Sequence, residues 1–153
     1  MVSGILEDYK NITPDTARTH GEKLYAYYGI TGIRGEAHEG FPHVLFSGYP
    51  GFQRAYKATC SLTKAGLTTL LYYMGNTEDT NLIIRSDYET ANRIQKSLSA
   101  FLNHSDYEEQ LSILPTLDDY FVSQNISPGG SADMLALTYF LYFLSQKDCW
   151  FES

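Results

Sequence analysis

The chain is poor in cysteine, and this scarcity narrows the classes of protein to which it can belong. Only two cysteines occur among its 153 residues, Cys60 and Cys149, and they lie far apart in the sequence. A disulfide-rich secreted scaffold or a zinc cluster needs several cysteines at short spacings. The sequence therefore predicts reduced thiols and a cytoplasmic protein.

Positive charge is also scarce. Eleven Lys and Arg residues stand against 18 Asp and Glu residues, which gives a formal net charge of −7. Proteins that bind nucleic acid backbones without sequence preference use basic surfaces, so the charge balance argues against nucleic acid as a partner. A bound polyanion would need a metal ion or a local group of hydrogen-bond donors.

Long hydrophobic runs are absent as well. The longest, Leu135 to Leu144, is much shorter than the roughly 20 residues that span a bilayer as a helix. The first residues, MVSGILEDYK, lack the basic segment and the apolar core of a signal peptide. We therefore expect no membrane association.

Helical periodicity runs through most of the chain, whose length suits a single domain over residues 1–153. Apolar residues recur at every third or fourth position between Asp87 and Leu102, which predicts a surface helix there. Further helices are expected at 13–28, 61–74, 105–113, 116–123 and 132–144. A short strand at 43–49 is the one competing pattern. The predicted fold class is all-α, a compact multi-helix bundle.

Three connecting segments carry more glycine and more functional groups than simple links need. They span residues 29–51, 75–87 and 125–134. The first is long for a connection inside a compact domain, and such segments are often functional. If the helices pack as a bundle, we expect the three segments to converge at one end.

The third segment, Asn125 to Met134 (NISPGGSADM), precedes an apolar helix and allows two interpretations. In one, Ser127 or Ser131 caps the helix and Asp133 lies in its first turn. In the other, the amides of residues 129–131 bind a phosphate group at the helix N-terminus. From the residues alone, the cap is the commoner case.

Other polar residues also have a simple structural interpretation. Asp79 equally suits the N-cap of the helix that follows it. Arg34 and Glu36 can form an exposed ion pair that contributes at most about 1 kcal/mol. His38 and His43 lack a third ligand and zinc-type spacing, so we interpret them as solvated loop histidines.

Three motifs occur in order along the chain, GIRGEAHEGFP (32–42), EDTNLIIR (78–85) and SPGGSADMLAL (127–137). Together they resemble the C-terminal half of the triphosphoribosyl-dephospho-coenzyme A synthase family. The resemblance implies an all-helical fold and a transferase that joins ribose C1 of ATP to the 2′-hydroxyl of 3′-dephospho-coenzyme A and releases adenine. The product is the precursor of the prosthetic group of citrate lyase or of malonate decarboxylase.

The family's N-terminal half carries a Pro-Lys-Pro-Gly-Leu-Val-Asp-type segment and a His-x-Asp-Met-type segment, and this sequence has neither. We therefore expect a fragment or one piece of a split enzyme, inactive alone, whose partner is an N-terminal half chain or a second copy. The alternative is a non-catalytic helical module that associates with such a partner through a broad exposed apolar surface.

The resemblance also implies roles for residues of the three segments. Substitution at ribose C1 develops positive charge on the sugar, which a nearby carboxylate stabilises while another acid or base transfers a proton. Mg²⁺ would bridge the phosphates and the carboxylates of Glu36 and Asp79. The implied catalytic residues are Glu36, Asp79 and Asp133, and the implied substrate ligands are Arg34, Asn81, Arg85, Ser127, Gly129, Gly130 and Ser131.

Overall fold

The computed structural model describes residues 4–147, which form helices joined by turns, with no strand among them. The elements are η1 (Glu7–Tyr9), α1 (His20–Tyr28), α2 (Ile33–Glu39), η2 (Val44–Gly48), α3 (Tyr49–Thr59), α4 (Leu62–Asn76), α5 (Thr80–Arg85), α6 (Tyr88–Leu102), α7 (Tyr107–Ser112), α8 (Leu114–Ser123) and α9 (Gly129–Lys147). The predicted all-α fold class is confirmed. Within the described range, no helix is long and apolar enough to cross a membrane.

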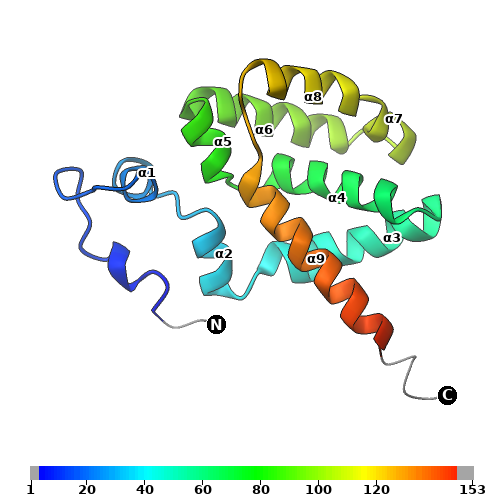
Figure 1. Ribbon diagram of the computed structural model, residues 1–153, viewed down its shortest axis with the longest axis horizontal. Helices are drawn as coiled ribbons and strands as arrows, with labels where there is room; N and C mark the ends of the chain where they lie inside the picture. Colours follow the sequence, from blue (N-terminus) through cyan, green and yellow to red (C-terminus); the bar gives the residue numbers. More distant parts are fainter. Residues whose placement is uncertain (1–3, 148–153) are drawn as a thin grey trace.

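Helix α4 is the centre of the fold. It packs against α3 and α6, and α9 crosses it (Figure 1). α8 lies at the top of this view and shares a hydrophobic cluster with α6. The N-terminal segment with α1 lies at the side, where α1 contacts α5. This arrangement brings the start of α9 next to the link between α4 and α5.

The central position of α4 follows from its residues, which are apolar or small on nearly all sides. Ser61 caps the helix by accepting a hydrogen bond from the Lys64 amide. Gly75 lets α6 approach closely, because a Cβ atom there would lie 3.0 Å from the Ser99 backbone nitrogen. The helix predicted at 61–74 is thus confirmed, and it continues to Asn76.

Buried apolar side chains form three clusters that share α4. The largest joins α4 with α5, α6 and α8 through residues such as Leu71, Leu82, Leu98 and Phe121. The second unites η2, α4 and α9, and the third unites α3, α4 and α9. Full burial of one large apolar side chain contributes roughly 1.5–3 kcal/mol, so these clusters hold the elements around the site in place.

The first helix begins later than the sequence predicted. The residues after Thr13 form only a turn, and α1 begins after Thr19, whose side chain accepts from the Glu22 amide. The Glu22 carboxylate accepts in return from the amides of Thr19 and Arg18, and these hydrogen bonds lower the pKa of Glu22. This reciprocal capping box fixes the helix start at Thr19. The predicted stop at Gly29 is confirmed, with a left-handed φ of 71°.

Two predictions for residues 29–51 were wrong. The segment is not an irregular connection, because it contains α2, η2 and the start of α3. The short strand expected at 43–49 is instead a π-helical turn over Val44–Gly48. The helix α3 was also missed, although Phe52 and Ala55 are buried three positions apart. Glycines at positions 32, 35, 40 and 48 interrupt the apolar periodicity of α2 and η2.

Candidate functional site

The three connecting segments converge at the start of α9, as expected (Figure 1). Asp79, in the link between α4 and α5, accepts hydrogen bonds from the amides of Gly130 and Ser131. Gly32, just before α2, packs against Thr80, where an added Cβ atom would lie 2.6 Å from Thr80 Cγ2. We call this meeting point the Asp79 junction.

Asp79 is only 4% exposed, and both of its carboxylate oxygens accept hydrogen bonds. Oδ1 accepts from the amides of Asn81 at 3.0 Å, Leu82 at 3.1 Å and Gly130 at 3.2 Å. Oδ2 accepts from the amide of Ser131 at 2.8 Å and from its hydroxyl at 2.9 Å. Burying a carboxylate is costly unless donors surround it in this way.

These contacts establish the cap role of Asp79 and leave the phosphate interpretation of the glycine motif untested. Asp79 is the N-cap of α5, and it also ties α5 to the first turn of α9. The amides of Gly130 and Ser131 do bind an anion at a helix N-terminus, but that anion is the carboxylate of Asp79. Their role as phosphate ligands stays a prediction.

The glycines of the third motif permit this close approach. An added Cβ atom on Gly129 would lie 2.3 Å from Asn81 Nδ2, and one on Gly130 would lie 3.3 Å from Asp79 Oδ1. Four of the predicted site positions, Asp79, Asn81, Gly129 and Gly130, therefore adjoin one another, and Ser131 completes the group through its hydrogen bonds.

Arg34 and Glu36 on α2 do not pair with each other. Arg34 Nη1 donates to Tyr9 Oη at 3.0 Å, and its guanidinium lies 5.3 Å from the Tyr9 ring centroid. Glu36 Oε1 contacts His43 Nδ1 at 2.5 Å, and Glu36 Oε2 accepts from the His43 amide at 3.3 Å. The interpretation of His43 as a loop histidine was wrong, because it lies at the start of η2 and Glu36 holds both its ring and its backbone.

The Glu36–His43 pair borders the buried core of α4 and α9. Tyr73, with 0% exposure, shares a hydrogen bond of 2.6 Å with Thr138. Burial raises the pKa of Tyr73 to about 12 against the opposing effect of that hydrogen bond, and the nearby Glu36 charge adds to the rise. The Glu36 side chain is 12% exposed and the His43 side chain is 41% exposed, so solvent reaches the imidazole.

Three other predicted residues lie outside the hydrogen bonds of the Asp79 junction. Arg85 is exposed at the end of α5. Ser127 precedes α9 and lines an apolar groove that also includes residues of α4 and α8. Asp133 is exposed and follows the first turn of α9, so the expectation that it lies in that turn was wrong.

One carboxyl group that the sequence reasoning did not assign also lies beside the junction. Glu78 precedes Asp79 and lines a cavity of about 40 Å³ together with Asn92 and Gln95 of α6. Desolvation raises the pKa of Glu78. Its position next to Asp79 in the EDTNLIIR motif was the only signal in the sequence.

The described residues do not provide a ready-made metal site. Residues 4–147 contain no group of three or more His, Cys, Asp or Glu side chains placed to hold an ion. Asp79 already accepts five hydrogen bonds, and the two oxygens of Glu36 face His43. This geometry does not favour either carboxylate as a Mg²⁺ ligand.

Comparisons with known proteins agree with the motifs. The family model described as ATP:dephospho-CoA triphosphoribosyl transferase matches residues 2–151. A protein of Vibrio cholerae serotype O1 (strain M66-2), named probable 2-(5''-triphosphoribosyl)-3'-dephosphocoenzyme-A synthase, is 35% identical over 148 residues, which cover 95% of this chain and 46% of that relative.

Two further relatives are also named 2-(5''-triphosphoribosyl)-3'-dephosphocoenzyme-A synthase, and the name of the second includes the word probable. The protein of Haemophilus ducreyi is 37% identical over 156 residues, covering 97% of this chain and 45% of its own length. That of Streptococcus equi subsp. zooepidemicus (strain MGCS10565) is 33% identical over 149 residues, covering 96% and 50%. The chain thus spans about half the length of the curated relatives it matches. No solved structure matches it.

Proposed function

We propose that this chain, which belongs to the ATP:dephospho-CoA triphosphoribosyl transferase family, supplies one part of the site that transfers a triphosphoribosyl group from ATP to 3′-dephospho-coenzyme A. The family match over residues 2–151 carries the proposal. In this reaction the bond between ribose C1 and adenine breaks, and C1 bonds to the 2′-oxygen of the acceptor. The acceptor hydroxyl loses its proton, and the departing adenine gains a proton.

In this proposal the Asp79 junction positions the substrate-binding residues. It fixes α5 against α9, so Asn81 and Gly129 face the substrates from adjacent elements. Arg34 and Thr80 line a cavity of about 330 Å³ beside the junction. The forked donors of a guanidinium suit triphosphate oxygens, and we assign this role to Arg34 with Arg85 as a second donor.

The Glu36–His43 pair suits the proton transfer. A carboxylate that holds one imidazole nitrogen leaves the other nitrogen oriented toward a reacting group, an arrangement common to many general bases. We therefore assign His43 to the removal of the proton from the 2′-hydroxyl, with Glu36 as its positioning residue. Glu36 then contributes to catalysis through His43.

ATP is expected to enter with Mg²⁺ on its phosphate oxygens. Because the oxygens of Asp79 and Glu36 already have hydrogen-bond partners in this chain, the ion would be held chiefly by the triphosphate and water. We assign no catalytic step to it.

An adenine-release assay tests the proposed function. ATP, Mg²⁺ and 3′-dephospho-coenzyme A would be added to this chain alone and to this chain co-expressed with the part of the Haemophilus ducreyi relative that it does not match. We expect release from the mixture, and we expect His43→Ala to lower its rate by about 10²-fold or more. His104→Ala, another exposed histidine, is the matched control. A stable complex that releases no adenine would count against the proposal.

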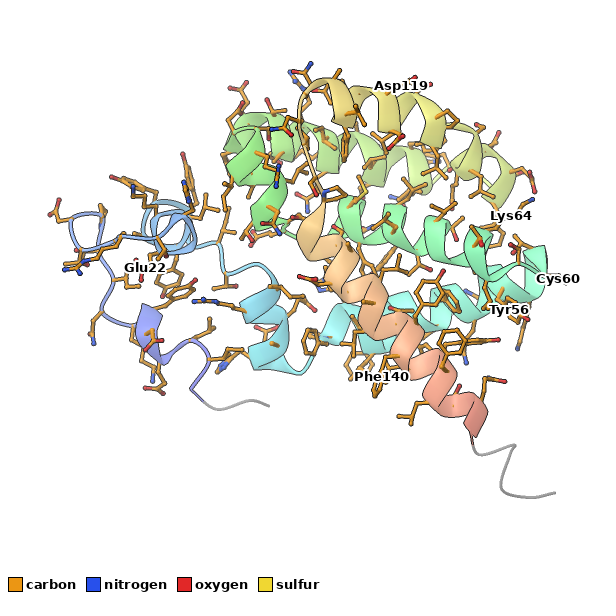
Figure 2. The ribbon with its side chains drawn as sticks, viewed as in Figure 1. Glu22, Tyr56, Cys60, Lys64, Asp119 and Phe140 are labelled. Atoms are coloured by element: carbon orange, nitrogen blue, oxygen red, sulfur yellow. The ribbon has the colours of Figure 1, made fainter. Side chains whose placement is uncertain are left out.

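The alternative function, association with a partner chain, is favoured by one observation. The outer half of α9 exposes Phe140, Phe143 and Leu144 to solvent, and Phe140 is labelled in Figure 2. Leu45 of the nearby η2 is exposed as well. Leu45 and Leu144 border one groove, and exposed apolar side chains grouped in this way are typical of a protein interface. We propose that it serves assembly of the transferase, so the two functions are compatible.

A further inference from the structure

A polar hollow lies between η2, α3, α4 and the α6–α7 region, apart from the residues assigned above. Its volume is about 390 Å³, within the range of roughly 300–1,000 Å³ typical of small-molecule sites. Thr68 and Thr69 of α4 lie in its lining and are buried. None of its lining residues belongs to the predicted site.

The charge of this hollow differs from that of the whole chain. The chain carries 18 acidic residues, yet no Asp or Glu lines the hollow among the described residues, and Arg54 is its one charged side chain. The ion pairs of residues 4–147 involve other groups, so Arg54 has no acidic partner in this part of the chain. An acid-free hollow with a guanidinium that no described acidic residue pairs favours an anionic ligand.

Aromatic side chains border the same hollow. Phe46 is 79% exposed, the largest exposure among the described large apolar residues, and Tyr72 lines the hollow from α4. A phenyl ring with this exposure forgoes most of the apolar burial that such a side chain normally contributes. A flat base stacked on Phe46 would cover it, which is a common way of binding a nucleobase.

Side-chain amides complete the lining. Asn76 Nδ2 donates to the Tyr72 carbonyl at 2.8 Å, and Gln110 Nε2 donates to the Ser105 carbonyl at 3.1 Å. These bonds fix both amides and leave their oxygens as acceptors, while Asn103 adds a third amide. Asn and Gln side chains match the donor and acceptor pattern of the adenine edge.

We propose that this hollow binds the adenosine 5′-phosphate portion of a nucleotide. Phe46 stacks on the base, the amides of Asn76 and Asn103 contact its edge, and Arg54 pairs with the phosphate. Both substrates of the proposed function, ATP and 3′-dephospho-coenzyme A, contain this portion. The assignment to a substrate therefore rests on the proposed function, whereas the recognition of the adenosine phosphate rests on the hollow alone.

Isothermal titration of the full chain tests the site directly. We expect ATP to bind, and we expect Arg54→Gln and Phe46→Ala each to weaken binding by about tenfold or more. Both side chains are exposed, so the variants should fold, which circular dichroism would verify. Arg93→Gln on α6 and Val122→Ala on α8 replace exposed residues outside the hollow and should leave affinity unchanged.

Two further ligands, 3′-dephospho-coenzyme A and inorganic triphosphate, show which part of the nucleotide is recognised. Competition between ATP and 3′-dephospho-coenzyme A would support a shared adenosine site, with the tighter ligand identifying the natural occupant. Inorganic triphosphate should bind much more weakly than ATP. Equal affinity for triphosphate and ATP, no binding of either nucleotide, or unchanged affinity in both hollow variants would overturn the proposal.

The adenine-release assay keeps this inference distinct from the proposed function. In one outcome, the mixture releases adenine while the Arg54→Gln and Phe46→Ala variants show unchanged KM for both substrates. In that case the hollow is not the substrate site, and the proposed transferase function is still supported. If the chain binds ATP through the hollow but no mixture releases adenine, the proposed nucleotide site is supported and the proposed transferase function is contradicted.

Discussion

Asp79 links more of the site than any other single residue, because one buried carboxylate accepts hydrogen bonds from both α5 and α9. Replacing it with Asn keeps the shape but turns an amide group toward backbone N–H donors. We expect Asp79→Asn to lower the free energy of unfolding by about 2–4 kcal/mol, measured by urea denaturation.

Asp133→Asn makes the same chemical change at an exposed position of α9. Its effect should stay within about 0.5 kcal/mol. Equal stability of the Asp79→Asn variant and the wild type would show that the junction is not held by charge.

The pH dependence of the free energy of unfolding tests the burial of the Tyr73 hydroxyl. Thr138 donates its only hydroxyl proton to the Met134 carbonyl, so Tyr73 must be the donor in their shared bond, and a phenolate cannot donate. Burial raises the pKa of Tyr73 to about 12, above its value of about 10 in an unfolded chain. The unfolded state therefore ionises first.

From this order of ionisation, the stability from Tyr73 is fully present below about pH 10 and is lost as pH rises toward 12. In Tyr73→Phe we expect stability at neutral pH to fall by about 1 kcal/mol and the alkaline decline to become shallower. Denaturation at several pH values would measure the difference between the two proteins. Parallel curves would contradict the assignment.

At the scale of elements, the approach of α4 to α6 is limited by Gly75. Alanine normally stabilises a helix interior by about 1 kcal/mol relative to glycine. At Gly75, however, the added methyl would lie 3.0 Å from the Ser99 nitrogen and 3.3 Å from Leu102 Cδ1. We expect Gly75→Ala to destabilise the fold by about 1 kcal/mol or more, since overpacking outweighs propensity.

Gly51→Ala in α3 is the matched control, because its nearest neighbour would be Arg54 Nη2 at 3.7 Å. This variant should be as stable as the wild type or more so in thermal unfolding. A stabilised Gly75→Ala variant would mean that α4 and α6 separate easily.

Helix boundaries show which elements local sequence can specify. Asp87 and Gly29 mark a start and an end correctly, because the capping hydrogen bonds and the left-handed φ involve only neighbouring residues. α3 was missed because its buried face, with Phe52 and Ala55, becomes apparent only against α4 and α9.

For the whole molecule, the exposed end of α9 predicts association. Within the described residues Phe140, Phe143 and Leu144 are 59%, 53% and 49% exposed, and large apolar side chains left exposed on one helix favour contact with another chain. We expect the chain alone to self-associate with increasing concentration in analytical ultracentrifugation, and more strongly in salt that screens its net charge of −7.

A Phe140→Ser, Phe143→Ser double variant should remain monomeric under the same conditions. Val122→Ser, at an exposed apolar position of α8, should behave as the wild type does. A wild-type chain that stays monomeric at every concentration and binds no counterpart chain would contradict an interface on α9.

Some properties of this protein follow from the sequence alone. The helical class and the family motifs depend on short-range patterns, and both are confirmed. Periodicity and caps act over a few residues, so they can be read without coordinates.

Other properties depend on contacts between distant residues. Asp79 and Ser131 are 52 positions apart, and no local pattern shows that the second motif's carboxylate occupies the helix N-terminus of the third. The same holds for the acid-free hollow, whose residues come from several helices between Phe46 and Gln110. Only the packing of α3, α6 and α9 around α4 determines which polar groups meet, because burial, and not sequence spacing, sets their partners.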